Sequence, residues 1–266
     1  MDKIKQKAKE LLESNKVQVV IGYEEGTAGK TRPVFITNAK NTDKLIFDDR
    51  CYHNLAVYLT KVDVKKMGRV AVVASLNTLK SIVKLSSEHQ VAFEDIDILG
   101  VDRSGELHEF ASMDDVLNYI HQNPVEYSPE EKSLLQKIES MTMEERWEFW
   151  QDQFSRCIKC YACRAACPNC YCDRCIVDIN QPQWIPTTSD NIGNLEWHIV
   201  RAMHLAGRCV NCGACADACP VNIPLNLLTL KMTEEINKDF GASDEFTLTD
   251  YPLSIYNSND KENFIK

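Results

Sequence analysis

The chain has 266 residues, of which 44% are hydrophobic, and this suits one large or two modest globular domains. Its net charge of −9 and pI near 5.2 argue against nucleic-acid binding, since phosphate contacts need a basic face. No apolar run approaches the roughly 20 residues that span a bilayer, and the N-terminal MDKIKQKAKELLESN lacks the apolar core of a secretory signal. We therefore expect a cytoplasmic protein without a membrane span.

Residues 17–101 alternate between strand and helix patterns. Strands are predicted at VQVVIGY, PVFIT, KLIFDD, GRVAVVAS and IDILGVD, and helices at NLAVYLTKV, LNTLKSIVKLSSEHQ and SMDDVLNYIHQN. Because strands that alternate with helices favour parallel pairing, residues 1–126 are predicted to form an α/β domain.

The segment 127–155 is predicted to be a helical connector. Two capping boxes, each with Glu three residues after the cap, begin at Ser128 and Thr142 and mark the starts of its helices. Trp147 and Trp150 are expected to pack between the domains. At the other end of the chain, residues 231–266 are predicted to form a helix and an extended tail along this subunit or a partner.

Twelve cysteines set this chain apart from an ordinary globular protein. The runs CIKCYACRAACP and CVNCGACADACP coincide at an offset of 52 residues, which is an internal repeat of C-x2-C-x2-C-x3-C-P. This run is typical of bacterial two-cluster ferredoxins, in which the fourth cysteine binds the other cluster. Zinc also binds paired thiolates, but zinc sites rarely show two such runs that end in proline. Residues 156–230 are therefore predicted to be a ferredoxin-like (α+β) domain with two [4Fe–4S] clusters.

The crossed rule assigns four cysteines to each cluster. Cluster one takes Cys157, Cys160, Cys163 and Cys219, and cluster two takes Cys209, Cys212, Cys215 and Cys167. The helix before Cys209 carries His198 and His204, which are interpreted as surface or packing residues, with tuning of cluster two as the alternative.

Four cysteines remain after this assignment: Cys51, Cys170, Cys172 and Cys175. The last three have ligand-like spacing, and Cys51 would have to reach across from the α/β domain, with His53 as a substitute. We predict a third metal site at the domain junction, either an iron–sulfur cluster or zinc. The alternative is a loop of buried or free thiols.

The sequence resembles a known family in RCIKCYACRAACPNCYCDRC and in QWIPTTSDNIGNLEWHIVRAMHLAGRCVNCGACADACPVNIPLNLL. It is similar to dicluster iron–sulfur proteins related to the beta subunits of deazaflavin-coenzyme-reducing hydrogenases and formate dehydrogenases. The resemblance extends through DDRCYHNLAVYL and GRVAVVASLNTLKSIVKLSSEHQ. It implies anaerobic metabolism and partner subunits of a flavin- or NAD-linked, hydrogenase, formate dehydrogenase or heterodisulfide-reductase-like complex.

The sequence departs from the family in two places. A Gly/Pro/Cys-type motif is replaced by Ser-Leu-Asn at 75–77, and a family cysteine is replaced around Asp102 to Ser104. These departures count against a flavin in this chain and leave the α/β domain a docking or degenerate flavin-type role.

Two functions follow. The favoured one is a non-catalytic electron-transfer subunit that relays single electrons between a partner flavin and another redox partner, because no dinucleotide fingerprint is present. The alternative is a flavin-containing subunit that itself reduces or oxidises a soluble cofactor, an inference by analogy with the fold.

Overall fold

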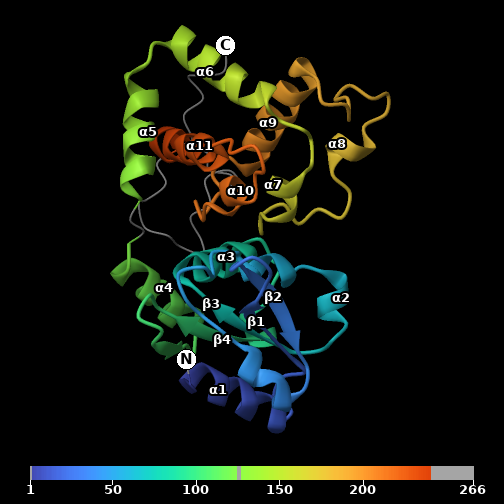
Figure 1. Ribbon diagram of the computed structural model, residues 1–266, viewed down its shortest axis with the longest axis vertical. Coiled ribbons are helices and arrows are strands. Elements are labelled where there is room, and N and C mark those ends of the chain that lie inside the picture. Colours follow the sequence, from blue (N-terminus) through green and yellow to red (C-terminus); the bar gives the residue numbers. More distant parts are fainter. Residues whose placement is uncertain (1, 125–126, 241–266) are drawn as a thin grey trace. The chain divides into compact units, whose positions relative to one another are not determined.

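The computed structural model describes residues 2–124 and 127–240, which form two compact units (Figure 1). The first unit is built mainly from residues 2–124, and the segment Ala166–Tyr171 groups with it. The second unit is built from residues 127–165 and 172–240.

A five-stranded sheet lies at the centre of the first unit. Its strands are β1 (Val19–Glu25), β2 (Thr31–Ile36), β3 (Val70–Ala74), β4 (Ile96–Val101) and β5 (Leu107–Glu109). The order is β2-β1-β3-β4-β5, in which the inner pairs β1–β3 and β3–β4 are parallel and the edge strands are antiparallel. Parallel pairing is thus confirmed for the inner strands. The edges differ because short turns connect β1 to β2 and β4 to β5, and such turns join only antiparallel neighbours.

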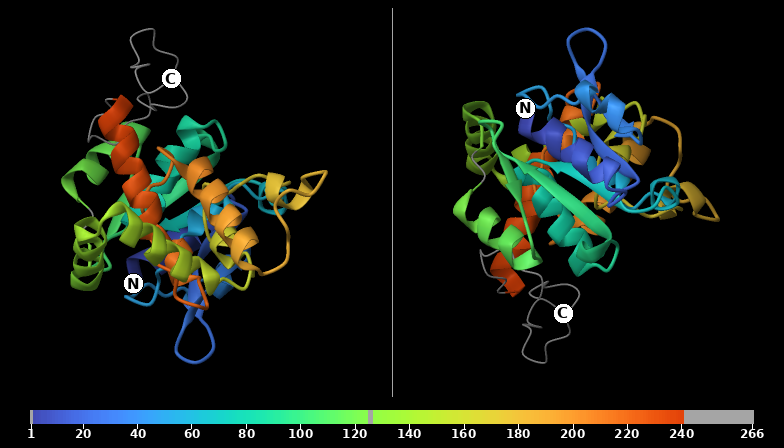
Figure 2. Two further views of the ribbon diagram at one scale, coloured as in Figure 1. Left: turned by 90° about the horizontal axis from the view of Figure 1, so that it is seen from above. Right: turned by 90° about the horizontal axis from the view of Figure 1, so that it is seen from below.

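Helices cover both faces of this sheet. They are α1 (Asp2–Glu13), η1 (Ala39–Lys44), η2 (Leu55–Tyr58), α2 (Val62–Lys65), α3 (Leu76–Ser87), η3 (Phe93–Asp95) and α4 (Met113–Gln122), where η marks a 3₁₀ helix. Figure 1 shows α3 and α1 on opposite sides of the sheet, and α1 is seen again in the right-hand view of Figure 2. The core between these layers is aliphatic and includes Ile21, Val72, Leu79 and Leu99.

Two sequence predictions for this unit are wrong. KLIFDD forms no strand beyond an isolated bridge between Ile46 and Tyr23, because the chain turns back at Asp48, whose carbonyl accepts from the Cys51 N–H at 2.9 Å. NLAVYLTKV is not one helix: it contains the short η2, and α2 begins only at its last residue, Val62. Strand β5 was not predicted, since its three residues are too short to show a pattern.

The second unit is helical. Its helices are α5 (Pro129–Ser140), α6 (Met143–Ser155), α7 (Ala162–Ala165), α8 (Ile176–Ile179), α9 (Asn191–Leu205), α10 (Ala214–Asp217) and α11 (Leu225–Phe240). Helix α9 packs against α6 and α11, as the left-hand view of Figure 2 shows. Residues 127–240 contain no strand, so the α+β character expected of the ferredoxin-like domain is absent from its described part. The reason is local: the cysteine runs wind into tight turns and single helical turns.

Both capping boxes of the connector are confirmed. The Ser128 hydroxyl accepts from the Glu131 N–H, and the Thr142 hydroxyl accepts from the Glu145 N–H. The two tryptophans of α6 have different environments. Trp150 stacks on Phe154 inside the second unit, whereas the side chain of Trp147 is 48% exposed. The predicted C-terminal arm lies largely in residues 241–266, outside the described residues. Within the described residues, no helix is long and apolar enough to cross a membrane.

Candidate metal centre

The first cysteine run begins where α6 ends. The Cys157 N–H donates to the Phe154 carbonyl, and the chain then winds through two left-handed residues, Lys159 (φ 49°) and Tyr161 (φ 57°), before α7. A bulky residue is rarely left-handed. The Tyr161 ring packs edge-on against Trp197, with centroids 4.9 Å apart, and this contact helps to hold the strained turn.

The second run repeats this geometry. Asn211 (φ 53°) and Gly213 (φ 76°) occupy the positions of Lys159 and Tyr161, and α10 follows as α7 does. The N–H of Lys159 lies 3.4 Å from the Cys157 sulfur, and the N–H of Asn211 lies 3.3 Å from the Cys209 sulfur. Backbone N–H groups that approach cysteine sulfurs in this way tune iron–sulfur clusters. The repeat seen in the sequence is therefore also a repeat of backbone conformation.

One cavity in the second unit gathers cysteines from both runs. Cys157, Cys160 and Cys163 line it together with Cys219, the last cysteine of the second run. The Cys219 sulfur accepts from the Ile223 N–H at 3.4 Å. The structure thus brings together the four residues assigned to cluster one.

The chemistry of this cavity fits bound iron. Burial raises the pKa of the Cys157 thiol, and the neighbouring Cys160 and Cys219 raise it further. Burial likewise raises the pKa of Cys163, to which Cys157, Cys160 and Cys219 also contribute. Four thiolates would repel one another here, and bound iron removes that repulsion because its charge favours deprotonated ligands.

Helix α9 and the loop before it fix the backbone of the first run. The side-chain amide of Asn194 and the hydroxyl of Ser189 both donate to the Cys157 carbonyl, at 2.8 and 2.6 Å. The Arg201 guanidinium donates to the Cys163 carbonyl at 3.2 Å. Because these carbonyls are held from outside the loop, the intervening N–H groups and sulfurs stay turned toward the cavity.

Three basic side chains are buried around this site. Lys159 is 7% exposed and donates to the Pro186 carbonyl, and Arg201 is 5% exposed. Gly193 of α9 lets Lys159 pass, since a Cβ there would lie 2.8 Å from the Lys159 ammonium nitrogen. His198 lines the cavity, and burial, then the charges of Arg201 and Lys159, lower its pKa to about 3. The structure thus places the His198 ring among the cysteines assigned to cluster one, whereas the alternative drawn from the sequence linked it to cluster two.

Three residues around the cavity were not predicted from the sequence: Lys159, Arg201 and Asn194. The sequence held one hint of Lys159: this long cationic residue stands in the C-x2-C loop of the first run, where the second run has the uncharged Asn211. It held no hint of Arg201 or Asn194, since α9 is an amphipathic helix on which burial depends on the packing of α6 and the cysteine loop.

The second run has a polar environment of its own. The Cys209 sulfur lies 3.4 Å from the Thr229 hydroxyl, and the Asn211 amide donates to the Tyr127 hydroxyl at 2.7 Å. Asp217 follows Cys215 on α10, where burial and then Glu131 raise the pKa of its carboxyl. Cys167, assigned as the fourth ligand of cluster two, belongs to the segment that groups with the first unit, so this ligand set stays a prediction.

The four extra cysteines lie in different environments. The backbone N–H of Cys170 donates to the Cys167 carbonyl, and Cys172 is exposed. Cys175 stands at the N-cap position of α8 and packs on the core of the second unit. Cys51 is 7% exposed in the first unit, where the Asp48 N–H lies 3.5 Å from its sulfur. The third metal site therefore stays a prediction.

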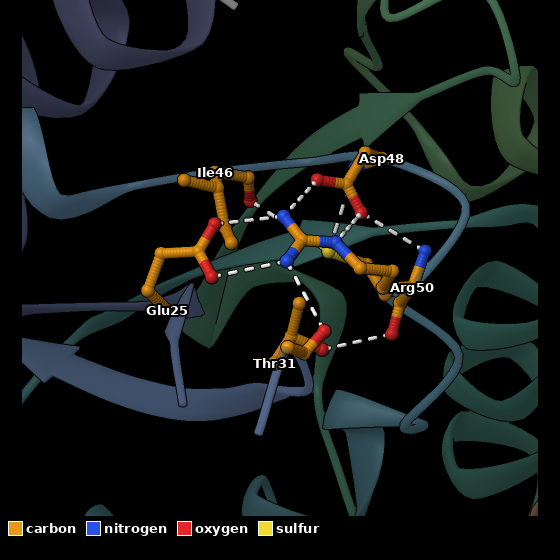
Figure 3. A network of polar contacts seen from close by, with 7 residues as sticks. Glu25, Thr31, Ile46, Asp48 and Arg50 are labelled. Carbon is orange, nitrogen blue, oxygen red and sulfur yellow. Dashed lines mark hydrogen bonds and ion pairs between the residues drawn. The ribbon is translucent and has the colours of Figure 1, made fainter. Parts of the chain in front are cut away.

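An ionic network fixes the loop that carries Cys51. Figure 3 shows the Arg50 guanidinium between the carboxylates of Glu25 and Asp48, each 2.7 Å from Nη2. The Thr31 hydroxyl donates to the Arg50 carbonyl at 2.8 Å. Hydrogen bonds to Asp48 and then Glu25 raise the pKa of Arg50. The substitute ligand His53 is partly buried, and burial lowers its pKa, so it is neutral near pH 7 and available as a donor or a ligand.

One family model and two known proteins match parts of this chain. Residues 205–224 match the family model described as a 4Fe-4S binding domain. The F420-dependent formate dehydrogenase subunit beta of Methanocaldococcus jannaschii is 35% identical over 114 residues, which are 41% of this chain and 29% of that protein. The F420-dependent formate dehydrogenase 1 subunit beta of Methanococcus maripaludis is 37% identical over 94 residues, which are 35% of this chain and 24% of that protein.

The aligned region thus spans less than a third of either relative. Within that limit, the family match covers the whole of the second cysteine run, whose last cysteine lines the cavity described above. The chain is therefore an iron–sulfur protein related to the beta subunits of F420-dependent formate dehydrogenases.

Proposed function

We propose that the chain is an electron-transfer subunit of a formate dehydrogenase-like oxidoreductase. It relays single electrons through two [4Fe–4S] clusters between a partner flavin and another redox partner. The names of the two relatives described above support this, because both are beta subunits of formate dehydrogenases.

One observation carries the proposal: a cysteine of the second run lines a cavity with three cysteines of the first run. Crossed ligation of this kind is what two-cluster ferredoxins use. It makes the two runs interdependent, so that neither can hold a complete cluster alone. A pair of separate zinc sites gives no reason for Cys219 to lie among the cysteines of the other run.

The residues around the cavity have clear tasks in such a relay. A [4Fe–4S] cluster supplies one-electron chemistry when bound. The four cysteines hold it, while Trp197, Ile223 and Leu225 line the cavity and keep water from it. Asn194 and Arg201 keep the loop from rearranging, so that little reorganisation accompanies electron transfer.

Metal analysis tests the proposal. After anaerobic purification or reconstitution, the chain should hold about eight irons with matching sulfide, or about twelve if the third site is a cluster. Stoichiometric zinc with little sulfide contradicts it. Spin-resonance spectra of the reduced protein should show two interacting clusters.

Two serine variants test the ligand sets. Cys219→Ser should lose or convert the cluster held mainly by the first run, whereas Cys167→Ser should affect the cluster of Cys209, Cys212 and Cys215. Serine keeps the size of the side chain and removes the thiolate, and Cys51→Ser serves as a control that spares both clusters. If each variant instead damages the cluster of its own run, the crossed assignment is wrong.

A second function is a flavin-containing subunit that itself reduces or oxidises a soluble cofactor. The words "F420-dependent" in the names of both relatives favour it. Against it, the two departures from the family lie at the carboxyl ends of β3 and β4, where open α/β sheets bind ligands. Ser75 there caps α3, and Asp102 accepts from the Ser104 hydroxyl and the Glu106 N–H, at 2.6 and 2.9 Å.

A flavin assay of the isolated chain separates the two functions. The relay predicts iron–sulfur absorption without stoichiometric flavin, even after incubation with flavin nucleotides. Bound flavin, together with reduction of a deazaflavin by the chain alone, supports the second function.

A further inference from the structure

His198 forms part of the wall of the cavity that gathers four cysteines. It projects from α9, is only 2% exposed, and lines the same cavity as Cys157, Cys163 and Cys219. A histidine is rarely buried so completely unless its ring nitrogens have partners. The hydrogen-bond partners of the two ring nitrogens therefore decide what this histidine does.

Aromatic packing fixes the ring. Its plane stacks on Phe154, with centroids 4.5 Å apart and an interplanar angle of 16°. Phe154 in turn stacks on Trp150, and Trp197 lies beside the ring at 6.5 Å. Because the ring nitrogens form hydrogen bonds in the plane of the imidazole, the stacking on Phe154 also fixes the directions in which those bonds can leave the ring.

Neither ring nitrogen has a hydrogen-bond partner among residues 2–124 and 127–240, although both are fully buried. An imidazole carries at least one N–H in either protonation state. This N–H therefore needs an acceptor that the described side chains and backbone do not provide. The ring lines the cavity whose four cysteines would hold cluster one, and the sulfurs of such a cluster are acceptors.

We propose that His198 is a positioning residue whose ring N–H donates a hydrogen bond to a sulfur of cluster one and raises the reduction potential of that cluster. This inference rests on the proposed function, because it requires the cluster. Reduction brings one electron from the redox partner onto the cluster, with no proton transfer. The added negative charge strengthens the N–H···S bond, so the reduced state gains more than the oxidised state.

The effect of His198 on the cluster differs in kind from that of the buried cations nearby. Lys159 and Arg201 act on the cluster through their charge, whereas His198 acts through one directed hydrogen bond. His204, on the same helix, is exposed and does not line the cavity, which makes it the matched control. A directed bond also leaves a magnetic signature that a distant charge does not.

The test uses the full chain, reconstituted anaerobically, in a spin-resonance redox titration. His198→Phe keeps an aromatic ring on Phe154 but removes the N–H. We expect reduction of cluster one to become about tenfold less favourable, equal to about 59 mV for one electron. Cluster two, identified by its loss in Cys212→Ser, should keep its potential, and His204→Phe should match the wild-type chain.

A second measurement looks for the bond itself. Pulsed spin resonance of the reduced chain, labelled with ¹⁵N-histidine, should show nitrogen coupling that His198→Phe removes and His204→Phe keeps. If His198→Phe fails to assemble cluster one, the wild-type coupling and the potential of His198→Gln, which keeps an N–H donor, decide the question.

The outcomes separate this inference from the proposed function. A wild-type chain with two clusters, no histidine coupling and an unchanged potential in His198→Phe overturns the inference and leaves the relay intact. A wild-type chain that holds no iron–sulfur cluster overturns the proposed function, and the inference with it.

Discussion

The two units bury their interiors in different ways. The first unit encloses an aliphatic core between a sheet and its helices, with side chains such as Ile21 and Leu79 almost fully buried. In the second unit, three of the eight buried residues in the described core are cysteines that line or adjoin the cluster loops. We therefore expect the hydrophobic effect to account for the stability of the first unit, and the second unit to depend also on bound metal, because binding energy at a structural metal site is also folding energy.

Removal of iron should produce the largest difference between the two units. Chelation of iron from the full chain should expose backbone amides throughout α9, since the thiolates would repel and the cavity would lose its contents. The strands β3 and β4 should keep their protection from hydrogen exchange, as measured by mass spectrometry before and after chelation. Equal loss of protection in both units would show that the first unit also depends on the metal.

The extra cysteines offer a way to sharpen the comparison. Cys172→Ser and Cys51→Ser should each lose the same amount of metal, one zinc or the iron of one cluster, if they share the third site. Elemental analysis of the variants, beside wild type, measures this directly. If only Cys172→Ser loses metal, His53 becomes the candidate ligand, and its His53→Ala variant should then lose the same equivalent. If neither variant loses metal, the extra cysteines serve packing alone.

A core truncation should act on the first unit alone. Leu79→Ala removes a side chain that is 1% exposed on α3 and should destabilise the unit by about 2–5 kcal/mol, through lost transfer energy and a cavity. Denaturant titrations, in which hydrogen exchange of the β3 amides reports unfolding, measure the change in the free energy of unfolding. Val62→Ala, at a residue 52% exposed, should change it by less than about 0.5 kcal/mol. Iron content should stay at the wild-type value in both variants.

The smallest expected effect is a pH dependence at the edge of the sheet. Burial alone would raise the pKa of Asp97, but hydrogen bonds from Lys16 and Arg69 outweigh it and lower that pKa below its ordinary value. A lowered carboxyl pKa contributes stability that is present above the unfolded pKa of about 3.9 and is lost as the pH falls through the folded pKa. The first unit should therefore lose stability in acid below about pH 4.

The Asp97→Asn variant tests this sign. It should be less stable than wild type at neutral pH and should lose less stability on acidification, because asparagine does not titrate. Asp63→Asn, at an exposed position on α2, should behave as wild type. If the stability of wild type and of Asp97→Asn falls in parallel as the pH is lowered, the acid sensitivity comes from other carboxylates.

Much of this architecture follows from local sequence patterns. The capping boxes at Ser128 and Thr142 satisfy N–H groups within one helical turn, so their effect is local and they mark real helix starts. The inner strands are continuous apolar runs that suit burial on both faces. The cysteine spacing specifies the winding of each loop, because the fixed reach of the chain sets where each sulfur lies.

The sequence pattern was insufficient where distant residues decide the outcome. KLIFDD has the composition of a strand, yet the Arg50 network turns its last residues away from the sheet. Antiparallel edges arise from short connections rather than from strand composition. His198 looked like one more polar residue on an amphipathic helix, because its neighbours Phe154 and Cys157 belong to another segment.

The sequence by itself determined the kind of chemistry, because two cysteine runs with this spacing specify thiolate ligands for iron. Only the tertiary structure decided what surrounds them. The burial of Lys159, Arg201 and His198 depends on helix α9 packing over the first cysteine loop, which no local pattern contains. Burial of a charged or polar group is a property of all its neighbours at once, whereas ligand spacing is a property of the chain alone.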